Sequence, residues 1–454
     1  MADAKIIILN GAPAGEDYLA PILAVLTDVL GGNNAELQTF TLRDIKLAHC
    51  IGCFGCWVET PGICVEADAG RDIARAIIRS ETTIFFTPVF CGGYSSELKR
   101  MVDRFIQLTL PYFISQGGEI HHRPRYARFP RLVVVGVQRH ANHEEASIFK
   151  VLAGRNAINF HAPSYAVEVV HGTEGSDALR QRFQFLLGRT DPLPSNAALA
   201  ALLPPREKSV TDGGADGARR RALLLVGSPK TKRASTSGVL GGFLLDRLEE
   251  FGWEIESHTL TAGLRQEAGQ LKLCSAVDRA DLVLLVFPLY VDALPFLLTK
   301  ALEVIAAHRQ ATSRMRTQRL AVVCNSGFPE AHQSTVAVAI CHRFAAQCSM
   351  IWSGALVMGA GEALSSGQLL TDPGRSGPPV AHVIQALDMA SAAFDAGDPV
   401  PPEAATLIAR SPFPFVTFNV WRWFFARMGD HHWNQQAAAN GVHRSELLAQ
   451  PYAA

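Results

Sequence analysis

The sequence has no excess of either charge, because 42 Lys and Arg residues balance 42 Asp and Glu residues among 454. A protein that binds nucleic acid concentrates basic residues against the phosphates, so this balance argues against a nucleic-acid partner. No uncharged apolar run reaches the roughly 20 residues of a membrane-spanning helix, and residues 1–5 lack the basic start of a signal peptide. We therefore expect a cytoplasmic protein without a membrane span.

Cysteine is scarce, at nine residues, and the cytoplasm keeps thiols reduced. Structural disulfides are therefore not expected, and ligand or redox roles are favoured for cysteines that lie close together in the sequence. Four of them do so, within residues 50–64. The cysteines of the second half have no ligand spacing and are expected to be small buried apolar residues.

Two halves of the chain begin alike, with a short apolar run that ends in glycine and is followed by a loop and an amphipathic stretch. This is the opening of a doubly wound α/β domain. Two more apolar segments recur in the same order, and the first of these has a proline near its carboxyl end in both copies. The paired segments are 5–11 with 222–227, 84–90 with 284–290, and 132–136 with 320–324.

The spacing between the copies shows where the first half is longer. The offset is 216 from Gly11 to Gly227, 200 from Pro88 to Pro288 and 188 from the fourth strand of one copy to that of the other. The first half therefore has extra residues before its third and fourth strands. The first surplus contains the four cysteines, and the second contains the run 117–123.

Strands that alternate with helical patterns predict parallel sheets with helices on both faces. A chain of 454 residues exceeds one hydrophobic core, so we predict an α/β protein of two tandem domains, each with a doubly wound parallel five-stranded sheet. The expected limits are 1–191 for the first domain, 192–220 for a linker, 221–362 for the second domain and 363–454 for a helical C-terminal extension. The aromatic run in this extension would cover the domains or a partner subunit, or lie on a membrane surface.

Ligands of such sheets bind beyond the carboxyl ends of the strands, near the point where the strand order reverses. In the second half, the loop GSPKTKRASTS at 227–237 combines small residues, hydroxyls and a helix start, which suits a monophosphate. The loop lacks the Gly-Lys-Ser/Thr ending of a loop that binds nucleoside triphosphates. The alternative to a phosphate site is a basic surface turn that is rich in hydroxyls. The loops 287–290 and 325–328 would enclose a flat ring, so FMN fits better than a bare phosphate.

With these three loops, residues 221–358 resemble the NADPH-dependent FMN reductases of the flavodoxin-like superfamily. The resemblance implies two tandem flavodoxin-like domains, bound FMN, and NAD(P)H as the co-substrate that stacks directly on the flavin. The cofactor-binding residues that follow from it are Ser228, Lys230, Ser235, Thr236, Ser237, Pro288, Leu289, Tyr290, Asn325, Ser326, Gly327 and Phe328.

The first half resembles the same superfamily through TPVFCGGYSSELK at 87–99. Its first loop departs from the pattern, because it has no hydroxyl and places Glu16 and Asp17 where a phosphate would lie. Negative side chains there oppose anion binding, so this half is not expected to hold FMN in the usual way. A second set of flavin-edge residues would be Pro88, Val89, Phe90, Gly92, Gly93 and Tyr94.

The four clustered cysteines resemble the compact motif of the iron-sulfur flavoproteins. Thiolates at such spacing can bind a [4Fe-4S] cluster or a tetrahedral zinc ion, and metal-free redox-active thiols are the third alternative. The residues are Cys50, Cys53, Cys56 and Cys64.

Two further interpretations concern polar residues of the first half. His121 and His122 would contact a substrate or the nicotinamide phosphate, or would belong to a solvated loop. Lys99 and Asp103, four residues apart on a predicted helix, would form a surface ion pair.

The function predicted from these features is an NAD(P)H-dependent FMN oxidoreductase that transfers hydride to a small acceptor such as a quinone, a flavin or a nitro compound. No catalytic acid or base stands out, because the cofactor supplies the hydride chemistry. The alternatives are an electron carrier of the iron-sulfur flavoprotein type and a non-catalytic flavin- or partner-binding module. The chain would form a homo-oligomer, or its two halves would pair as an internal pseudo-dimer.

Overall fold

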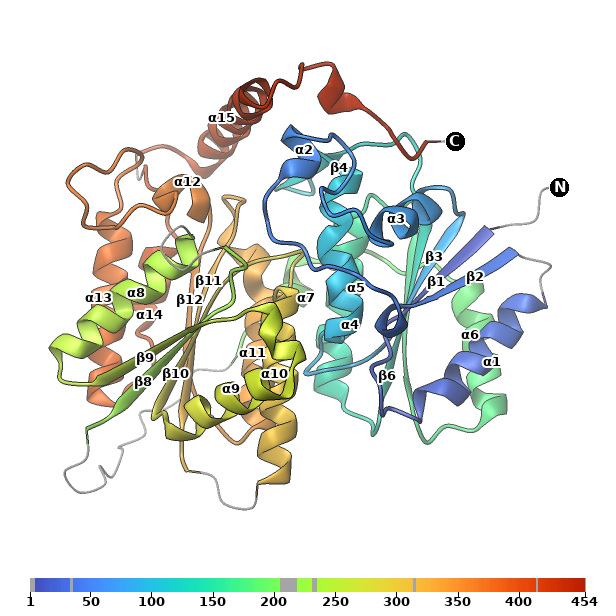
Figure 1. The fold of residues 1–454 in the computed structure, drawn as a ribbon, viewed down its shortest axis with the longest axis horizontal. Helices are drawn as coiled ribbons and strands as arrows, with labels where there is room; N and C mark the ends of the chain where they lie inside the picture. Colours follow the sequence, from blue (N-terminus) through green and yellow to red (C-terminus); the bar gives the residue numbers. More distant parts are fainter. Residues whose placement is uncertain are drawn as a thin grey trace. The chain divides into compact units, whose positions relative to one another are not determined.

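The computed structural model describes residues 5–32, 36–204, 219–230, 235–312, 316–413 and 415–453. The chain forms two compact units, drawn in Figure 1. Unit one is Met1–Ala201 with Ala426–Ala454, and unit two is Leu202–Phe425. Residues 205–218 of the predicted linker lie outside the described residues.

Unit one contains a five-stranded parallel sheet with the order β2-β1-β3-β6-β7. One face packs against helices α1 and α6, where Ile8, Ile84 and Val133 are fully buried. Helix α5 packs on β6 and β7. The strands are β1 (Lys5–Asn10), β2 (Glu36–Thr41), β3 (Thr82–Pro88), β6 (Arg131–Gln138) and β7 (Tyr165–His171). The helices are α1 (Leu19–Gly31), α2 (Gly55–Val58), α3 (Gly70–Ile78), α4 (Ser96–Val102), α5 (His143–Asn159), α6 (Ser176–Gly188) and α7 (Asn196–Ala200).

Unit two repeats the same topology, with the parallel order β12-β11-β10-β8-β9. Counted along each unit, both orders read 2-1-3-4-5, which is the flavodoxin-like doubly wound order, so the predicted fold class is confirmed. The strands are β8 (Arg221–Val226), β9 (Glu254–Thr259), β10 (Leu282–Pro288), β11 (Arg319–Asn325) and β12 (Ile351–Met358). The helices are α8 (Thr236–Glu250), α9 (Glu267–Arg279), α10 (Phe296–Ala311), α11 (Thr335–Gln347), α12 (Gly361–Ser365), α13 (Ala381–Ala396) and α14 (Pro402–Ile408). Short 3-10 helices lie at Leu42–Asp44, Asp103–Leu108, Ala262–Arg265, Ala331–Ser334 and Glu446–Leu448.

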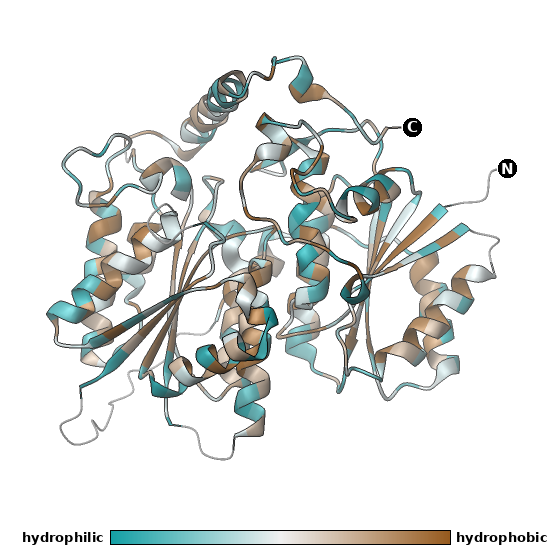
Figure 2. Cartoon of the chain, in the orientation of Figure 1, coloured by the Kyte–Doolittle hydropathy of each residue, from teal (hydrophilic) through white to brown (hydrophobic). Residues whose placement is uncertain are grey.

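The central strands of both sheets, such as β6 and β10, are almost continuously apolar, as the brown colour in Figure 2 shows. Parallel strands covered by helices on both faces need this composition, because neither face meets water. The apolar runs that paired in the sequence are therefore the buried central strands.

The turn that follows the third strand of each unit has the same backbone in both copies. Phe90 bridges to Gly93 in unit one, and Tyr290 bridges to Ala293 in unit two. Cys91 and Val291 both have φ near 51°, a left-handed conformation that is rare for a β-branched residue. The repeat in the sequence is thus also a repeat in local geometry.

Unit two continues beyond the expected limit of 362. Helix α13 packs beside α8 and buries Val383, Leu387 and Phe394 in the core of this unit. The physical reason is that a doubly wound sheet needs a helix over this face, which α8 alone does not cover. The start of the predicted extension is therefore the last helical layer of unit two.

Helix α15 (Phe418–Ala439) begins in the sequence of unit two and ends in that of unit one. Within this helix Trp421 and Phe425 are buried and Trp423 is exposed, and Phe415, which precedes the helix, is also exposed. Within the described ranges, no helix combines the length and the apolar character that crossing a membrane requires.

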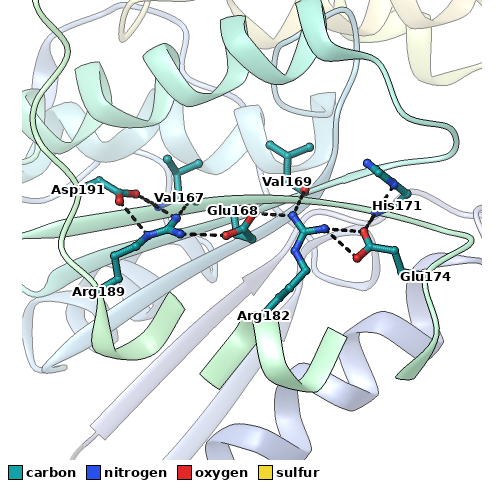
Figure 3. Close-up of polar contacts among 8 residues, drawn as sticks. All are labelled: Val167, Glu168, Val169, His171, Glu174, Arg182, Arg189 and Asp191. Carbon is teal, nitrogen blue, oxygen red and sulfur yellow. Dashed lines mark hydrogen bonds and ion pairs between the residues drawn. The ribbon is translucent and has the colours of Figure 1, made fainter. Parts of the chain in front are cut away.

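The edge strand β7 is covered by an ion-pair network (Figure 3). Arg182 donates to Glu168 at 2.5 Å and to the carbonyl oxygen of Val169 at 2.7 Å, and Arg189 donates to the carbonyl oxygen of Val167. The network also contains Glu174 and Asp191. An edge strand with unpaired backbone groups invites pairing with another chain, and these side chains occupy those groups.

The second insertion of unit one is a β-hairpin rather than a loop. It consists of the antiparallel strands β4 (Thr109–Gln116) and β5 (Glu119–Pro124). His121 and His122 lie on β5, so the interpretation of a solvated loop is wrong. His121 is 1% exposed, and its ring lies 3.1 Å from the Asn159 side chain.

Candidate functional site

The switch point of the unit-two sheet lies at the carboxyl ends of β8 and β10, the position at which doubly wound folds have their ligand crevice. The chain leaves β8 toward β9 on one side and leaves β10 toward β11 on the other, so the loops diverge there. In doubly wound sheets this switch point is where ligands bind. The three loops that the sequence singled out follow β8, β10 and β11.

Two hydrogen bonds bring these loops together. Ser237 donates through Oγ to Oδ1 of Asn325 at 2.8 Å, which joins the hydroxyl-rich loop to the loop after β11. The backbone N–H of Leu289 donates to the carbonyl oxygen of Asn325 at 2.8 Å, which joins the loop after β10 to the same residue. Asn325 is therefore the centre on which the three loops converge.

The loop after β8 leads into a capped helix. Oγ of Ser235 accepts a hydrogen bond from the N–H of Gly238 at 3.0 Å, which is the preferred start of a helix. The side chains of Ser228 and Ser237 are 3% and 1% exposed. Residues 231–234 lie outside the described residues. Because the first N–H groups of a helix lack partners within it, the start of α8 can receive an anion.

A fourth loop, after β12, also reaches this crevice and was not predicted. Nζ of Lys230 forms an ion pair with Glu362 at 3.0 Å, and Oγ of Ser365 donates to Oγ1 of Thr236 at 2.9 Å. Gly361 makes this approach possible, because a Cβ atom there would lie 2.9 Å from Cβ of Asn325. A glycine that follows a strand was the one signal in the sequence.

The loops 287–290 and 325–328, which were predicted to enclose a flat ring, are held by backbone and side-chain hydrogen bonds. The N–H of Tyr290 donates to the carbonyl oxygen of Ala293 at 3.0 Å, and that of Ser326 donates to the carbonyl oxygen of Met358 at 2.9 Å. Oγ of Ser326 donates to the carbonyl oxygen of Phe328 at 2.9 Å. Val291 has a positive φ, and such strained positions cluster at ligand sites.

The corresponding loops of unit one make contacts with each other and with neighbouring residues. Oγ of Ser95 donates to the carbonyl oxygen of Gly11 at 2.6 Å, and Glu16 forms an ion pair with Arg139 at 2.9 Å. Tyr94 is 3% exposed and packs edge-on against Phe149. The second flavin-edge set thus lies in one turn, but Tyr94 belongs to the aromatic core.

The interpretation of Lys99 and Asp103 as a surface pair is wrong. They form an ion pair in which the side chains are 2% and 1% exposed. Helix α4, which carries Lys99, is followed directly by the 3-10 helix Asp103–Leu108, in which the Arg104 side chain is 1% exposed and contacts Asp68 at 2.7 Å. These charges are therefore buried inside unit one rather than displayed to solvent.

The four cysteines of the first insertion lie near one another but differ in exposure. Cys53 is exposed, Cys50 and Cys64 are half-buried, and Cys56 is buried. Burial raises the pKa of Cys50 to about 12 and the pKa of Cys56 well above its usual range, and the neighbouring thiols add to both effects. The N–H of Gly55 donates to Sγ of Cys53 at 3.4 Å.

The arrangement bears on the choice of metal. Zinc needs its ligand atoms at roughly 2.0–2.3 Å from one point, and among the described residues no group of three or more His, Cys, Asp or Glu side chains could hold an ion in this way. A [4Fe-4S] cube spaces its four thiolates more widely than one ion does, so the cluster stays a prediction. The cysteines of the second half are all buried, as predicted.

Comparison with known proteins places the family match in unit one. Residues 4–172 match the family model of NADPH-dependent FMN reductase. The chain is 29% identical over 118 residues to an iron-sulfur flavoprotein of Methanocaldococcus jannaschii, covering 26% of this chain and 60% of that protein. It is 24% identical over 108 residues to an iron-sulfur flavoprotein of Archaeoglobus fulgidus, covering 24% and 46%. The chain therefore spans less than two thirds of the length of these relatives.

Part of this chain is also similar to solved structures. The NAD(P)H:quinone oxidoreductase from Methanothermobacter marburgensis has a TM-score of 0.33 at 16% identity, over 40% of this chain and 95% of that chain. An FMN-dependent NADH-azoreductase from Bacillus anthracis has a TM-score of 0.30 at 16% identity, over 40% and 95%.

Proposed function

We propose that this protein is an NAD(P)H-dependent flavin oxidoreductase whose FMN site lies at the carboxyl edge of the unit-two sheet. The observation that carries the proposal is the hydrogen bond from Ser237 to Asn325, because it joins the hydroxyl-rich loop to a ring loop at the switch point. The match of residues 4–172 to the NADPH-dependent FMN reductases supports the same chemistry.

The residues of the crevice suit a flavin monophosphate. The phosphate would lie at the start of α8, held by its N–H groups and by the hydroxyls of Ser228, Ser235 and Thr236, while Ser237 would position the loop through its hydrogen bond to Asn325. Lys230 would add a positive charge. Pro288, Leu289 and Tyr290 would line one side of the ring, and Asn325, Ser326, Gly327 and Phe328 the other. When bound, FMN supplies hydride transfer from NAD(P)H to an acceptor.

A binding experiment on the full chain tests the location of the site. Ser237→Ala removes the buried hydroxyl that joins the two loops through Asn325, so we expect FMN to bind about fivefold more weakly, as measured by quenching of flavin fluorescence, because such a hydrogen bond contributes about 1 kcal/mol. Ser275→Ala, on α9 of the same unit, is the control and should leave the affinity unchanged.

Unit one carries the family match, so it supplies the competing location. Phe90→Ala changes the second flavin-edge set. If Phe90→Ala weakens FMN binding and Ser237→Ala does not, the flavin lies in unit one and the proposed location is wrong. If the reconstituted chain binds no FMN, the proposed function itself fails. Oxidation of NADPH in the presence of quinone, free flavin or nitro acceptors then identifies the substrate class.

A second candidate function, electron transfer through a [4Fe-4S] cluster, is favoured by the closeness of the four thiols and by the names of the two archaeal relatives. Anaerobically purified protein should then contain about four irons per chain. Cys53→Ser should lower the iron content, whereas Cys91→Ser, outside the motif, should not. An iron-free spectrum with an intact flavin would exclude this candidate.

A further inference from the structure

The two insertions of unit one and the segment 433–453 form a small core of their own around the cysteine motif. This core is separate from the main cores of the two sheets. Its buried members are Cys56, Trp57, Val58, Leu110, Tyr112, Ala437 and Leu447, with Phe54, Ile106, Trp433 and Val442 packed against them. The hairpin supplies one wall of this core, and residues 433–453, which we call the strap, supply the other.

Trp433 lies against the loop that separates Cys53 from Cys56. Its ring centroid is 5.0 Å from that of Phe54 and 4.9 Å from that of Trp57, and both contacts are edge-on. Phe54 holds a left-handed backbone conformation with φ 58°, so the loop is folded into a shape that these ring contacts stabilise. Removal of Trp433 would uncover the buried side of this loop.

The strap is fastened at its far end by backbone contacts. The buried guanidinium of Arg125 donates to the carbonyl oxygens of Leu447 at 2.9 Å and Ala449 at 2.8 Å. Arg79 donates to the carbonyl oxygen of Tyr452 at 3.3 Å. All three nitrogens of the buried Arg125 guanidinium donate hydrogen bonds, and such charge-assisted bonds hold their partners strongly.

The strap also reaches the last cysteine of the motif. The hydroxyl of Tyr452 donates to Oε1 of Gln107 at 3.1 Å, and the N–H of Cys64 donates to the same oxygen at 3.1 Å. A Cβ atom on Gly62 would lie 2.6 Å from Cδ of Pro451. Contacts of the strap therefore extend from the Cys53–Cys56 loop to Cys64.

We propose that residues 433–453 are a strap that closes the cysteine motif and determines which of its thiols react, leaving Cys53 accessible and shielding Cys56. The motif opens only when the strap lifts, as a local unfolding step below global unfolding. This inference does not depend on the FMN site of unit two, and it concerns the four thiols when no metal is bound to them.

The test is timed alkylation of the full-length, reduced, chelator-treated protein with N-ethylmaleimide, with each cysteine quantified by peptide mass spectrometry. In the unaltered protein Cys53 should be labelled first and Cys56 last of the four. Trp433→Ala should accelerate the labelling of Cys56 by about tenfold or more, because an aromatic side chain is lost from the cover. Gln436→Ala, an exposed position of the same helix, is the matched control and should change nothing.

Cys91, which is 1% exposed in unit one, reports whether the unit stays folded. Unchanged labelling of Cys56 in Trp433→Ala, with Cys91 protected, overturns the proposal. If Trp433→Ala also exposes Cys91, the milder Tyr452→Phe decides. Tyr452→Phe deletes only the hydroxyl that contacts Gln107. If Cys64 is then labelled about threefold faster, the proposal is supported, whereas an unchanged labelling rate overturns it.

Discussion

Asp68→Asn is expected to destabilise unit one by loosening both ends of the cysteine insertion. Oδ2 of Asp68 accepts hydrogen bonds from the N–H of Ala48 and from Nη1 of Arg104, each at 2.7 Å. Oδ1 accepts from the N–H of Gly70 at 2.9 Å. One carboxylate therefore ties the residue that precedes the cysteines, the start of α3 and a buried guanidinium together.

The expected loss follows from the burial of the pair. The Arg104 side chain is 1% exposed and that of Asp68 is 14% exposed. Removing one partner of a buried pair costs roughly 3–5 kcal/mol because it leaves the other charge uncompensated. Since Asp68 is partly exposed and Asn keeps some hydrogen bonds, we expect a loss of about 2–3 kcal/mol of unfolding free energy.

The assay is equilibrium unfolding in urea, with hydrogen-exchange mass spectrometry to assign the transition to unit one. Asp72→Asn is the matched control, because its ion pair with Arg75 on the same helix is exposed and should contribute less than about 1 kcal/mol. If Asp68→Asn shifts the unit-one transition no more than Asp72→Asn does, the reasoning is refuted.

The pH dependence gives a second test of the same pair. Although burial opposes it, the contacts with Arg104 and with backbone N–H groups lower the pKa of Asp68. A carboxyl with a lowered folded pKa contributes stability that is present above its unfolded pKa of about 3.9 and is lost as the pH falls through the folded pKa. The difference between the unaltered protein and Asp68→Asn should therefore be constant near neutral pH and shrink below about pH 4.

Two further predictions concern other parts of unit one. Burial, with neighbouring His121, lowers the pKa of His122 to about 3, so between pH 7 and pH 4 the unfolded state binds a proton that the folded state does not. The free energy of unfolding should therefore fall from pH 7 to pH 4. His122→Phe should make this fall smaller, as measured by urea unfolding at each pH. Arg182→Met uncovers part of the β7 edge, so dynamic light scattering should show more self-association, and an unchanged particle size would count against the protective role of the network.

The cysteine insertion shows what sequence spacing can and cannot predict. The four thiols form a local unit because they lie within fifteen positions, and the offset between the repeats marked them as an insertion. Their cover comes from Trp433 and Tyr452, more than 350 residues further along the chain. No local pattern predicts that contact, because it depends on where the chain returns after folding.

The proposed flavin site was likewise predicted in part. Apolar periodicity and turn residues predicted the loops after β8, β10 and β11, because an apolar run followed by glycine, proline or other turn residues marks the end of a strand. The loop after β12, with Glu362 beside Lys230, was missed, because its role depends on which loop ends lie together at the edge of the sheet.

The sequence by itself determined the α/β class, the repeat and the apolar strands, because these follow from composition and from patterns with short periods. Only the tertiary structure decided that Lys99 and Asp103 are buried, that His121 and His122 lie in a hairpin, and that α13 completes unit two. Each of these depends on which surfaces the folded chain removes from water, and a charged or polar residue looks the same in the sequence on either side of that boundary.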